Sequence, residues 1–389
     1  MKFLIIAGAS GSLINFRGQL IMELIKSGLE VHAAAPDLNK DELTRMKLVR
    51  MGARVHDIHL NRTGMNPLHD LRTLLGLVRL MGNLKPDYVM GYTIKPVIFG
   101  TLAAVLTRCP RRFALITGLG YCFSGYGQTP RTRFIGSIAA SLYRQSLRFA
   151  NKVFFQNPDD QALFRDRNII GESVPSVVVN GSGVDIDHFM PREYPRQVVF
   201  LLIARLLVDK GVREYAEAAY RLKAEYPEAV FMLVGDLDSN PNSITAQELD
   251  RWVQDGVINY LGKLDDVRDA LGSASVFVLP TFYREGIPRT ILEALAMGRP
   301  IITTNTPGCR ETVIDGVNGY LVPPQDTTEL ANAMRAFIHT PQLIATMGKR
   351  SREQALRKYD VCKVNAVMLR EMGIPCSSVS SISALPRSC

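Results

Sequence analysis

Four charged residues in the second half of the chain have types and spacings suited to chemistry: Arg205, Lys210, Glu285 and Glu293. Arg205 and Lys210 follow the predicted strand QVVFLLIAR (197–205), and one Arg with one Lys at a strand end suits a diphosphate. The Arg fork bonds phosphate oxygens in pairs, whereas the Lys acts as a point charge. Glu293 lies inside a predicted helix whose other positions are mostly apolar. Such a carboxylate requires partners for its oxygens.

The segment between the two glutamates, GIPRTIL, predicts the start of a helix with Pro288 at its first position. The free amides of that first turn carry a partial positive charge and suit the same phosphates. A single Arg or Lys at a strand end is most often only a surface cation. The combination of two cations with two spaced carboxylates favours a binding site instead.

The elements that must position these residues follow an α/β pattern. Short apolar, β-rich runs alternate with helical patterns, which is typical of parallel sheets. Strands are predicted at 2–8, 29–35, 53–60, 87–92, 112–118, 152–156 and 176–180, and again at 197–205, 229–236, 257–262, 275–280 and 299–304. Two doubly wound, Rossmann-like domains in tandem would place their strand ends toward a shared cleft, where such sheets bind ligands.

The predicted domain boundaries follow from composition and length. With 389 residues, the chain is too long for one ordinary core. Residues 180–197 are rich in turn residues and are interpreted as a linker. We expect an N-terminal domain at 1–185, a second domain at 186–355, a helix at 356–374 that returns to the first domain, and a disordered Ser-rich tail at 375–389.

The net charge of +9 belongs entirely to the first half of the chain. Residues 1–190 contain 23 Lys/Arg and 14 Asp/Glu, whereas residues 191–389 contain 23 of each, and no acidic residue occurs at 88–158. This asymmetry indicates an anionic partner, either nucleic acid, a membrane surface or a phosphorylated substrate, or else a solvated basic face.

Apolar runs are too short to cross a bilayer, and the N-terminus does not fit a signal peptide. Six scattered cysteines suit a reducing compartment.

Arg205, Lys210 and the Glu-x7-Glu pattern in EGIPRTILE resemble the donor site of retaining glycosyltransferases of the GT-B fold, family 4. The segments YLGKLDDVRDAL (260–271) and GVNGYLVPPQDTTEL (316–330) are similar to further parts of that family, in the same order. The resemblance covers roughly residues 1–372. It implies an α/β fold of the GT-B type, with two Rossmann-like domains that face a cleft, and a nucleotide-sugar donor without a metal or other cofactor.

By that resemblance, Glu293 binds the ribose of the nucleotide and Glu285 contacts the transferred sugar near its 3- and 4-hydroxyls. Arg205 and Lys210 neutralise the diphosphate leaving group, and a ligand diol would satisfy the helix-borne carboxylate. The catalytic set is therefore Glu285, Lys210 and Arg205. The donor-binding set is Glu293, Gly11, Ser12, Gly235, Asp236, Lys263, Leu264, Gly286, Ile287, Pro288, Arg289 and Thr290.

Two departures from the family pattern concern the cleft. Ala204 stands before Arg205 where many members have Gly, so this loop is expected to be slightly stiffer. Many members also keep a histidine in the wall formed by the first domain, whereas the corresponding loop here has Tyr92, Thr93 and Lys95. The role of that histidine, which contacts the 6-hydroxyl of the sugar, is therefore unassigned.

The predicted acceptor side comes from loops that follow strands of the first half. The segments GYTIKPVIFG (91–100) and TGLGYCFSGYG (117–127) resemble the family 4 subset that acts on polyprenyl-diphosphate-linked sugars, which includes bacterial enzymes that add GalNAc or galactose to lipid-linked bacillosamine. Lys95 is a candidate for binding the acceptor diphosphate. An equally weighted alternative is that Lys95 is only an exposed residue at the start of a helix. The acceptor-side set is Arg17, Tyr92, Lys95 and Tyr121.

Residues 130–152 predict a basic amphipathic helix. Ile135, Ile138, Ala139, Leu142 and Phe149 fall on one side, and Arg133, Arg144 and Arg148 fall on the other with Lys152 near them. We expect the apolar side to pack on the sheet and the basic side to be available to phospholipid headgroups. Metal sites are not expected. The histidines of HDIH (56–59) point to opposite faces of a strand, and DLD (236–238) is interpreted as a strand-end loop beside the nucleotide.

These patterns together predict a retaining transferase that moves a hexose or N-acetylhexosamine from a UDP-sugar to a polyprenyl-diphosphate-linked saccharide. It would work at the cytosolic face of the inner membrane, bound to the anionic membrane surface. A transferase with a soluble acceptor is the alternative. An oxidoreductase would explain the strand-to-helix glycines Gly8 and Gly11, and a nucleic-acid binder would explain the charge, but neither employs the four charged residues.

Overall fold

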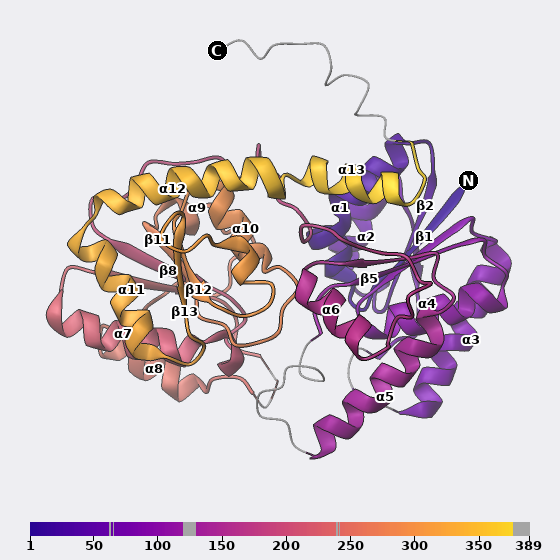
Figure 1. Ribbon diagram of the computed structural model, residues 1–389, viewed down its shortest axis with the longest axis horizontal. Helices are drawn as coiled ribbons and strands as arrows, with labels where there is room; N and C mark the ends of the chain where they lie inside the picture. The colour runs from indigo at the N-terminus through magenta and orange to yellow at the C-terminus, as the bar shows by residue number, and fades with distance from the viewer. Residues whose placement is uncertain (62–63, 65, 120–129, 239, 241, 376–389) are drawn as a thin grey trace, which may run out of the picture. The chain divides into compact units, whose positions relative to one another are not determined.

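The computed structural model describes residues 1–61, 64, 66–119, 130–238, 240 and 242–375 (Figure 1). Within it the chain forms two compact units. The first unit consists of Met1–Ser182 together with the chain from Cys362 onward, and the second consists of Gly183–Val361. Each unit contains one parallel sheet with helices on its faces, so the predicted α/β class with two doubly wound domains is confirmed. The predicted tail at 375–389 lies outside the described residues except for its first position.

The sheet of the first unit has seven strands in the order β3-β2-β1-β4-β5-β6-β7, and the pairs are parallel throughout. The strands are β1 (Lys2–Ile6), β2 (Glu30–Ala35), β3 (Arg54–Asp57), β4 (Tyr88–Tyr92), β5 (Arg111–Ile116), β6 (Lys152–Phe155) and β7 (Ser176–Val178). The central strands are buried along their length, which explains why they read as continuous apolar runs.

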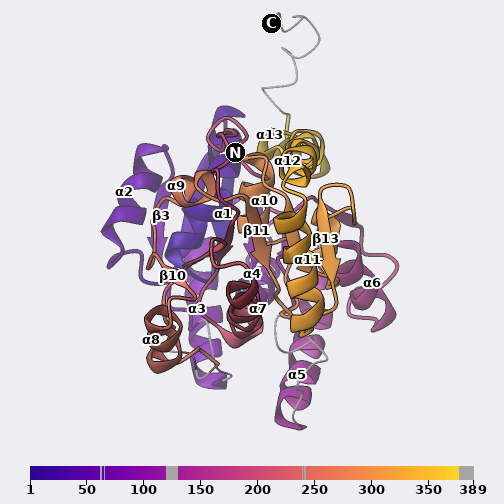
Figure 2. The same cartoon turned by 90° about the vertical axis from the view of Figure 1, so that its left-hand side faces the viewer.

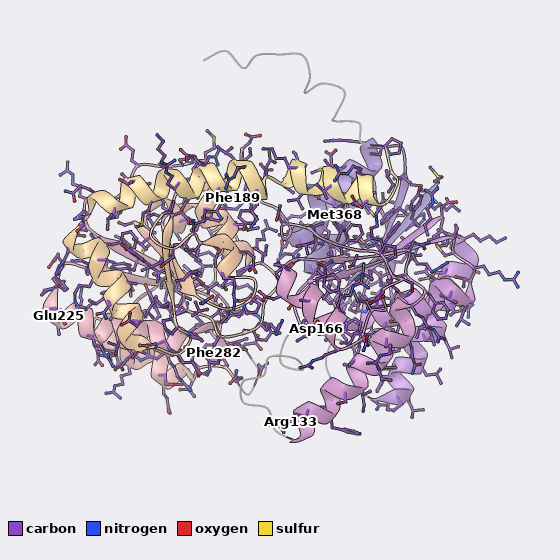
Figure 3. The ribbon with its side chains drawn as sticks, in the orientation of Figure 1. Arg133, Asp166, Phe189, Glu225, Phe282 and Met368 are labelled. Carbon is purple, nitrogen blue, oxygen red and sulfur yellow. The ribbon has the colours of Figure 1, made fainter. Side chains whose placement is uncertain are left out.

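Helices cover both faces of this sheet. They are α1 (Ser10–Lys26), α2 (Glu42–Arg50), α3 (Pro67–Leu84), α4 (Ile94–Leu106), α5 (Pro130–Leu147), α6 (Pro158–Asp166) and α13 (Val361–Glu371). One core contains residues of α3, α4, α5 and α6, and the other contains residues of α1, α2 and α13 (Figures 1 and 2). Met368 and Leu369 bring α13 into the second of these cores, where both side chains are buried (Met368 is labelled in Figure 3).

The sheet of the second unit has six strands in the order β10-β9-β8-β11-β12-β13. The strands are β8 (Val199–Ile203), β9 (Val230–Val234), β10 (Asn259–Tyr260), β11 (Val276–Leu279), β12 (Ile301–Thr304) and β13 (Gly319–Val322). The α-helices of this unit are α7 (Val212–Glu225), α8 (Ala246–Gln254), α9 (Arg268–Gly272), α10 (Arg289–Ala296), α11 (Thr327–His339) and α12 (Gln342–Gln354). A π-helical turn, Ala355–Tyr359, continues α12 toward the end of the unit.

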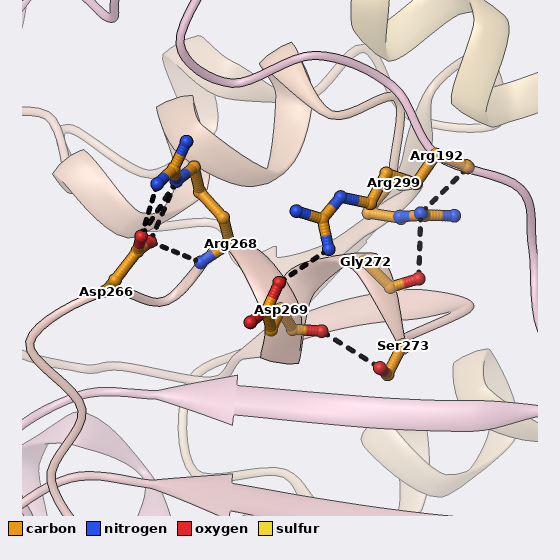
Figure 4. Close-up of polar contacts among 7 residues, drawn as sticks. All are labelled: Arg192, Asp266, Arg268, Asp269, Gly272, Ser273 and Arg299. Atoms are coloured by element: carbon orange, nitrogen blue, oxygen red, sulfur yellow. Dashed lines mark hydrogen bonds and ion pairs between the residues drawn. The ribbon is translucent and has the colours of Figure 1, made fainter.

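The segment interpreted from the sequence as a linker is packed on the second unit from residue 183 onward. The buried Arg299 donates to the carbonyl oxygens of Arg192 and Gly272, at 2.9 and 3.1 Å (Figure 4). Its guanidinium also lies over the ring of Tyr194. Arg352 donates in the same way to carbonyls of this segment and of α10. These bonds explain why residues with little periodicity are nonetheless ordered.

Among the described residues, no helix combines the length and the apolar character that crossing a membrane would need.

Candidate active site

Each sheet contains one point at which the strand order reverses, and the predicted site residues gather there. In the second unit this point lies between the neighbouring strands β8 and β11. The connections that leave these two strands run to opposite faces of the sheet, and sheets of this kind bind ligands in a crevice at the carboxyl ends of such strands. Lys210 lies in the short 3-10 helix Val208–Lys210 that follows β8, and Glu285 lies in the loop that follows β11.

The structure joins these two residues in an ion pair. Lys210 Nζ donates to Glu285 Oε1 at 2.6 Å, and the side chains are only 12% and 15% exposed. The same ammonium lies 5.0 Å from the centroid of the Tyr283 ring, in a cation–π contact. A carboxylate and an aromatic face thus hold one cation at the crevice, where removal of either charged partner would leave the other charge poorly solvated.

Backbone contacts fix the two loops to each other. The carbonyl oxygen of Asp209 accepts hydrogen bonds from the amides of Phe282 and Tyr283, at 3.0 and 3.2 Å, and from Thr281 Oγ1 at 2.9 Å. Gly211 has a φ of +75°, and a Cβ at this position would overlap the carbonyl of Pro280. Close approach of the two loops therefore requires a glycine here.

A third loop, after β12, supports the backbone beneath Glu285. Gly308 has a φ of +85°, and a Cβ there would overlap the carbonyl oxygen of Gly286. The neighbouring Cys309 is fully buried, and burial together with the charge of Glu285 raises the pKa of its thiol to about 12. Cys309 therefore stays a neutral, inert part of the core rather than a nucleophile.

Glu293 has a partner within its own helix. It is 6% exposed, and its Oε1 accepts from Arg289 Nε at 2.7 Å, one helical turn earlier. Burial raises the pKa of Glu293, while the charge of Arg289 and its hydrogen bond oppose that shift. Pro288 stands at the N-cap of α10 rather than at its first helical position, which leaves the amides of the first turn without a side-chain cap.

Arg205 of the catalytic set and Lys263 of the donor-binding set follow β8 and β10, the two strands on either side of β9. Arg205 Nη1 donates to Asp238 Oδ2 at 2.8 Å, and its side chain is 50% exposed. Lys263 Nζ lies 3.7 Å from Asp236 Oδ2, and both side chains are well exposed. Such exposed pairs contribute little stability, so these cations can exchange a carboxylate for a phosphate at low cost.

Gly235 and Leu264 complete this part of the predicted set. A Cβ on Gly235 would overlap the carbonyl oxygen of Ala204, so the loop after β9 lies directly against the loop after β8. The amide of Gly235 donates to Gly262 at 2.9 Å, and Leu264 packs at the edge of the core on that side of the sheet. The predicted residues Gly286, Ile287 and Thr290 belong to the loop and first turn that join Glu285 to Glu293.

In the first unit the strand order reverses between β1 and β4, and two predicted residues meet there. Ser12 Oγ, in the first turn of α1, lies 2.8 Å from the hydroxyl of Tyr92 at the end of β4. Burial raises the pKa of Tyr92, so its hydroxyl stays protonated. Arg17 is 2% exposed, with its guanidinium carbon 5.5 Å from the centroid of the Tyr92 ring. Apart from its own helix, nothing lies within 4 Å of the point that a Cβ on Gly11 would occupy.

Lys95, at the start of α4, is paired rather than solvated. Its Nζ donates to Asp70 Oδ1 of α3 at 2.7 Å, and the side chains are 12% and 19% exposed. Thr93, just before this helix, has a φ of +68°, a strained value for a β-branched residue. Tyr121, the last residue of the acceptor-side set, lies outside the described residues.

Each histidine of the HDIH segment lies beside another histidine. His56 Nε2 lies 2.8 Å from His32 Nδ1 on the adjacent strand, and His59 lies beside His69. Within the described ranges, no group of three or more His, Cys, Asp or Glu side chains is arranged to hold a metal ion.

The basic amphipathic helix predicted at 130–152 is present as α5, which ends at Leu147, and part of its predicted apolar side packs on the core. Ala139 and Leu142 of the predicted apolar side pack on the core of the first unit, together with the buried side chains of Tyr143 and Leu147. Arg144 donates to the carbonyls of Arg167 and Asn168, and Lys152 pairs with Glu371 at 2.6 Å. Part of the predicted basic face is therefore used within the unit.

Several residues of the site were not predicted from the sequence. Tyr283, Asp209 and Gly308 shape the position of Lys210 and Glu285. Asp238 belongs to the DLD segment that was expected beside the nucleotide, but its pairing with Arg205 was not predicted. Only the spacing of Arg289 and Glu293, four positions apart in a helix, contained a signal for a contact, since such side chains are neighbours. The other contacts join loops that lie far apart in the sequence.

Comparisons with known families agree with this architecture. Residues 4–157 match the family model "Glycosyl transferase 4-like", and residues 197–340 match "Glycosyl transferases group 1". Together the two models cover more than half of the chain, one in each structural unit.

Two similar curated proteins are named as transferases that act on diphospho-undecaprenol-linked sugars. The chain is 28% identical over 374 residues to the N,N'-diacetylbacillosaminyl-diphospho-undecaprenol alpha-1,3-N-acetylgalactosaminyltransferase of Campylobacter jejuni, with 92% of this chain and 95% of that protein covered. It is 24% identical over 310 residues to the UDP-Gal:alpha-D-GlcNAc-diphosphoundecaprenol alpha-1,3-galactosyltransferase of Escherichia coli, which covers 76% of this chain and 77% of that protein.

A similar solved structure is that of Anabaena Alr3699/HepE in complex with UDP, with a TM-score of 0.74, 20% identity, and coverage of 96% of this chain and 100% of that chain. At this identity the likeness concerns the fold. With the family models in both units and the crevice residues in place, the chain belongs to the glycosyltransferases of the GT-B fold, with a glycosyl transferase 4-like first half and a second half of the group 1 type.

Proposed function

We propose that this glycosyltransferase moves a hexose or N-acetylhexosamine from a UDP-sugar, with retention of configuration, to a polyprenyl-diphosphate-linked saccharide. The observation that carries the proposal is the nearly buried Lys210–Glu285 pair at the strand-order reversal of the second unit. A cation and a carboxylate side by side suit a ligand whose diphosphate and sugar hydroxyls are also neighbours.

On the donor side, Lys210 and Arg205 neutralise the diphosphate and the uncapped first turn of α10 adds its amides. Glu285 accepts hydrogen bonds from the sugar hydroxyls, and Glu293 accepts from the ribose while Arg289 balances its charge. The donor also approaches Gly11 and Ser12. The surface at Gly11 has room for a phosphate, because apart from its own helix nothing lies within 4 Å of the point that a Cβ on Gly11 would occupy.

Catalysis is chiefly electrostatic in this proposal. The carbon–oxygen bond to the leaving diphosphate breaks as Lys210 and Arg205 stabilise the charge that develops on its oxygens. The exposed pair of Arg205 with Asp238 opens readily, so the guanidinium turns to the phosphate without a large loss. No metal ion is required, since the two cations and the helix amides together balance the diphosphate.

The proposed acceptor follows from the relatives and from the first unit. Two similar proteins carry names that state lipid-diphosphate-linked acceptors. Lys95 is close to Tyr92 in sequence and lies at the carboxyl edge of the same sheet. Its ammonium binds the acceptor diphosphate when its ion pair with Asp70 breaks. Because an acceptor of this kind is anchored in a membrane by its lipid, we propose that the enzyme acts at the cytosolic face of the inner membrane.

The test is a transfer assay with a panel of UDP-sugars and polyprenyl-diphosphate-linked acceptors, with the anomeric configuration of the product read by NMR. An α-linked product on the lipid-linked saccharide from an α-configured donor is expected. Transfer only to water-soluble acceptors would support the soluble-acceptor alternative, and an inverted product would contradict the retaining mechanism.

A further inference from the structure

Helix α3 exposes a row of leucines that the fold does not use. Leu68, Leu71 and Leu75 are 78%, 52% and 59% exposed, and their spacing of three and four positions places them along one side of the helix. Together with Arg72 and Arg79, they and Gly76 line a shallow, mainly apolar hollow on the surface. We name these six residues the α3 stripe.

The α3 stripe lies opposite to the side of the helix that packs on the core. Thr73, Leu77 and Met81 are the buried positions of α3, and at about 100° per residue they fall on the far side from the exposed leucines. A single apolar side is sufficient to dock a helix on its sheet. The second apolar row therefore requires another explanation than internal packing, because contiguous exposed apolar patches mark interaction sites.

The charges of the stripe select the partner. Arg72 and Arg79 are exposed beside the leucines, and they make no ion pair among the residues that the structure describes. The acidic residue of this helix, Asp70, is held by Lys95 on another side. Leucines flanked by arginines suit a surface that has anionic headgroups above an apolar layer.

A second copy of the chain fits this surface less well. In a two-fold symmetric contact the same patch meets itself, so the arginines of one stripe would face those of the other. Like charges without carboxylate partners oppose such an interface. An anionic lipid surface complements the arginines and accepts the leucines at once.

We infer that the α3 stripe is the surface through which this protein docks on anionic membrane, with the leucines in the headgroup boundary and the arginines on phosphate groups. This inference rests on the proposed function for its purpose, since a docked enzyme meets lipid-linked substrates. The same helix contributes Asp70 to the Lys95 pair, so the membrane contact and the candidate acceptor cation are connected through one element. The docking surface is thereby assigned to α3 instead of to the basic helix α5.

The experiment measures binding of the full chain to vesicles of phosphatidylglycerol and phosphatidylcholine by flotation. Leu68→Gln, Leu71→Gln and Leu75→Gln combined remove the apolar row and keep a good helix former at each position. We expect this variant to bind anionic vesicles roughly tenfold or more weakly than the natural protein, because each inserted leucine contributes buried apolar area. The variant Arg72→Gln with Arg79→Gln should lose the preference for phosphatidylglycerol and most of the salt dependence.

The matched control is Leu43→Gln with Val49→Gln on α2, an exposed pair on another helix of the same unit, at 61% and 54% exposure. It should bind vesicles as the natural protein does. Equal loss in the control, no loss in the α3 variant, or a change of oligomeric state in place of vesicle binding would each overturn the inference.

Failure of this inference is distinguishable from failure of the proposed function. Transfer to a lipid-linked acceptor dispersed in detergent does not depend on vesicle docking, so the α3 variant should keep it. Normal transfer with unchanged vesicle binding would remove the docking surface alone, whereas absence of transfer with every lipid-linked acceptor would remove the proposed function alone. Circular dichroism confirms that each variant is folded.

Discussion

At the scale of single residues, the candidate site of the second unit contains charged side chains that are largely buried and therefore poorly solvated. Lys210 and Glu285 neutralise each other, and Tyr283 supports the cation from one side. Glu293 is more deeply buried, and its carboxylate is paired with Arg289. Charged groups are rarely kept in such places for stability, because desolvation offsets much of their attraction. Their arrangement is better explained by a ligand that replaces one partner of each pair.

The first prediction concerns Lys210. In the variant Lys210→Ala we expect kcat for transfer to fall by about 10²–10³, because the developing charge on the leaving diphosphate loses one of the two cations assigned to it. Glu285→Ala should also lose transfer, but it should keep more of the affinity for UDP, since this carboxylate is assigned to the sugar. Both are measured by product formation and by calorimetric titration with UDP.

Arg213→Ala is the matched control for loss of a cation, because Arg213 forms an exposed pair with Glu248 in the same unit. It should transfer normally. Full transfer by Lys210→Ala, with an unchanged melting temperature, would contradict the assignment of this residue.

The second prediction concerns the pH dependence of stability through Glu293. Its pKa is raised by burial, so the folded state holds this proton more tightly than the unfolded state does, and the stability from this group is lost as pH rises through the folded pKa. Glutamine does not titrate. The free energy of unfolding of Glu293→Gln relative to the natural protein should therefore increase between pH 4.5 and pH 7.5 in urea titrations, while the affinity for UDP falls. A difference that stays constant with pH would show that burial does not raise the pKa of this carboxyl.

At the scale of elements, three loops converge so that two charged side chains meet. The turn after β8 accepts backbone hydrogen bonds from the loop after β11. The loop after β12 lies in close contact with the backbone at Gly286. These contacts need glycines at Gly211 and Gly308, where the backbone has positive φ and another carbonyl lies within the space of a side chain. Positioning of this kind matters for catalysis because small displacements of reacting groups reduce the rate steeply.

The third prediction tests that convergence with two glycines of similar backbone conformation. Gly308→Ala should reduce transfer about 10²-fold or more, because the new methyl group must push the carbonyl of Gly286 and with it Glu285. Gly316→Ala is the matched control, with a φ of +73° and no atom within 4 Å of a Cβ. Its strain should cost about 1–2 kcal/mol of stability and leave transfer intact. Steady-state kinetics and thermal unfolding provide both readouts, and equal kinetic effects of the two changes would refute the positional argument.

At the scale of the whole molecule, the chain returns to its first unit after it completes the second. Met368 and Leu369 of α13 are buried in the core formed with α1 and α2, and Lys152 pairs with Glu371 at 2.6 Å. The last described helix is therefore part of the unit that contains the N-terminus. Removal of its apolar side chains would leave a cavity in that core.

The fourth prediction is that Leu369→Ala destabilises the first unit by about 2–5 kcal/mol, the usual range for a buried leucine. Trp252 is the single tryptophan and lies in the second unit, so its fluorescence reports on that unit, whereas far-UV circular dichroism reports on both. The denaturation detected by circular dichroism should shift to lower urea while the fluorescence transition stays. Arg370→Ala, at a largely exposed side chain, should change neither signal. An identical response in both variants would contradict the role of α13 in the core.

The sequence alone determined the α/β class, the two parallel sheets and the positions of most strands. Fully buried parallel strands are short apolar runs between helical patterns, and that signal is local. It also determined the family, since Arg205, Lys210 and the Glu-x7-Glu spacing stand in linear order at strand ends. That family decides against the oxidoreductase alternative raised by the Gly8 and Gly11 segment.

Only the tertiary structure decided which of these residues meet. Three contacts join segments that are separated in the chain: the cation–π contact of Lys210 with Tyr283, the close backbone approach of Gly308 to Gly286, and the ion pair of Lys95 with Asp70. It also decided that Leu68, Leu71 and Leu75 remain outside, because a helix with two apolar sides can present only one of them to its sheet. Periodicity specifies that a side is apolar, and packing specifies which side is buried.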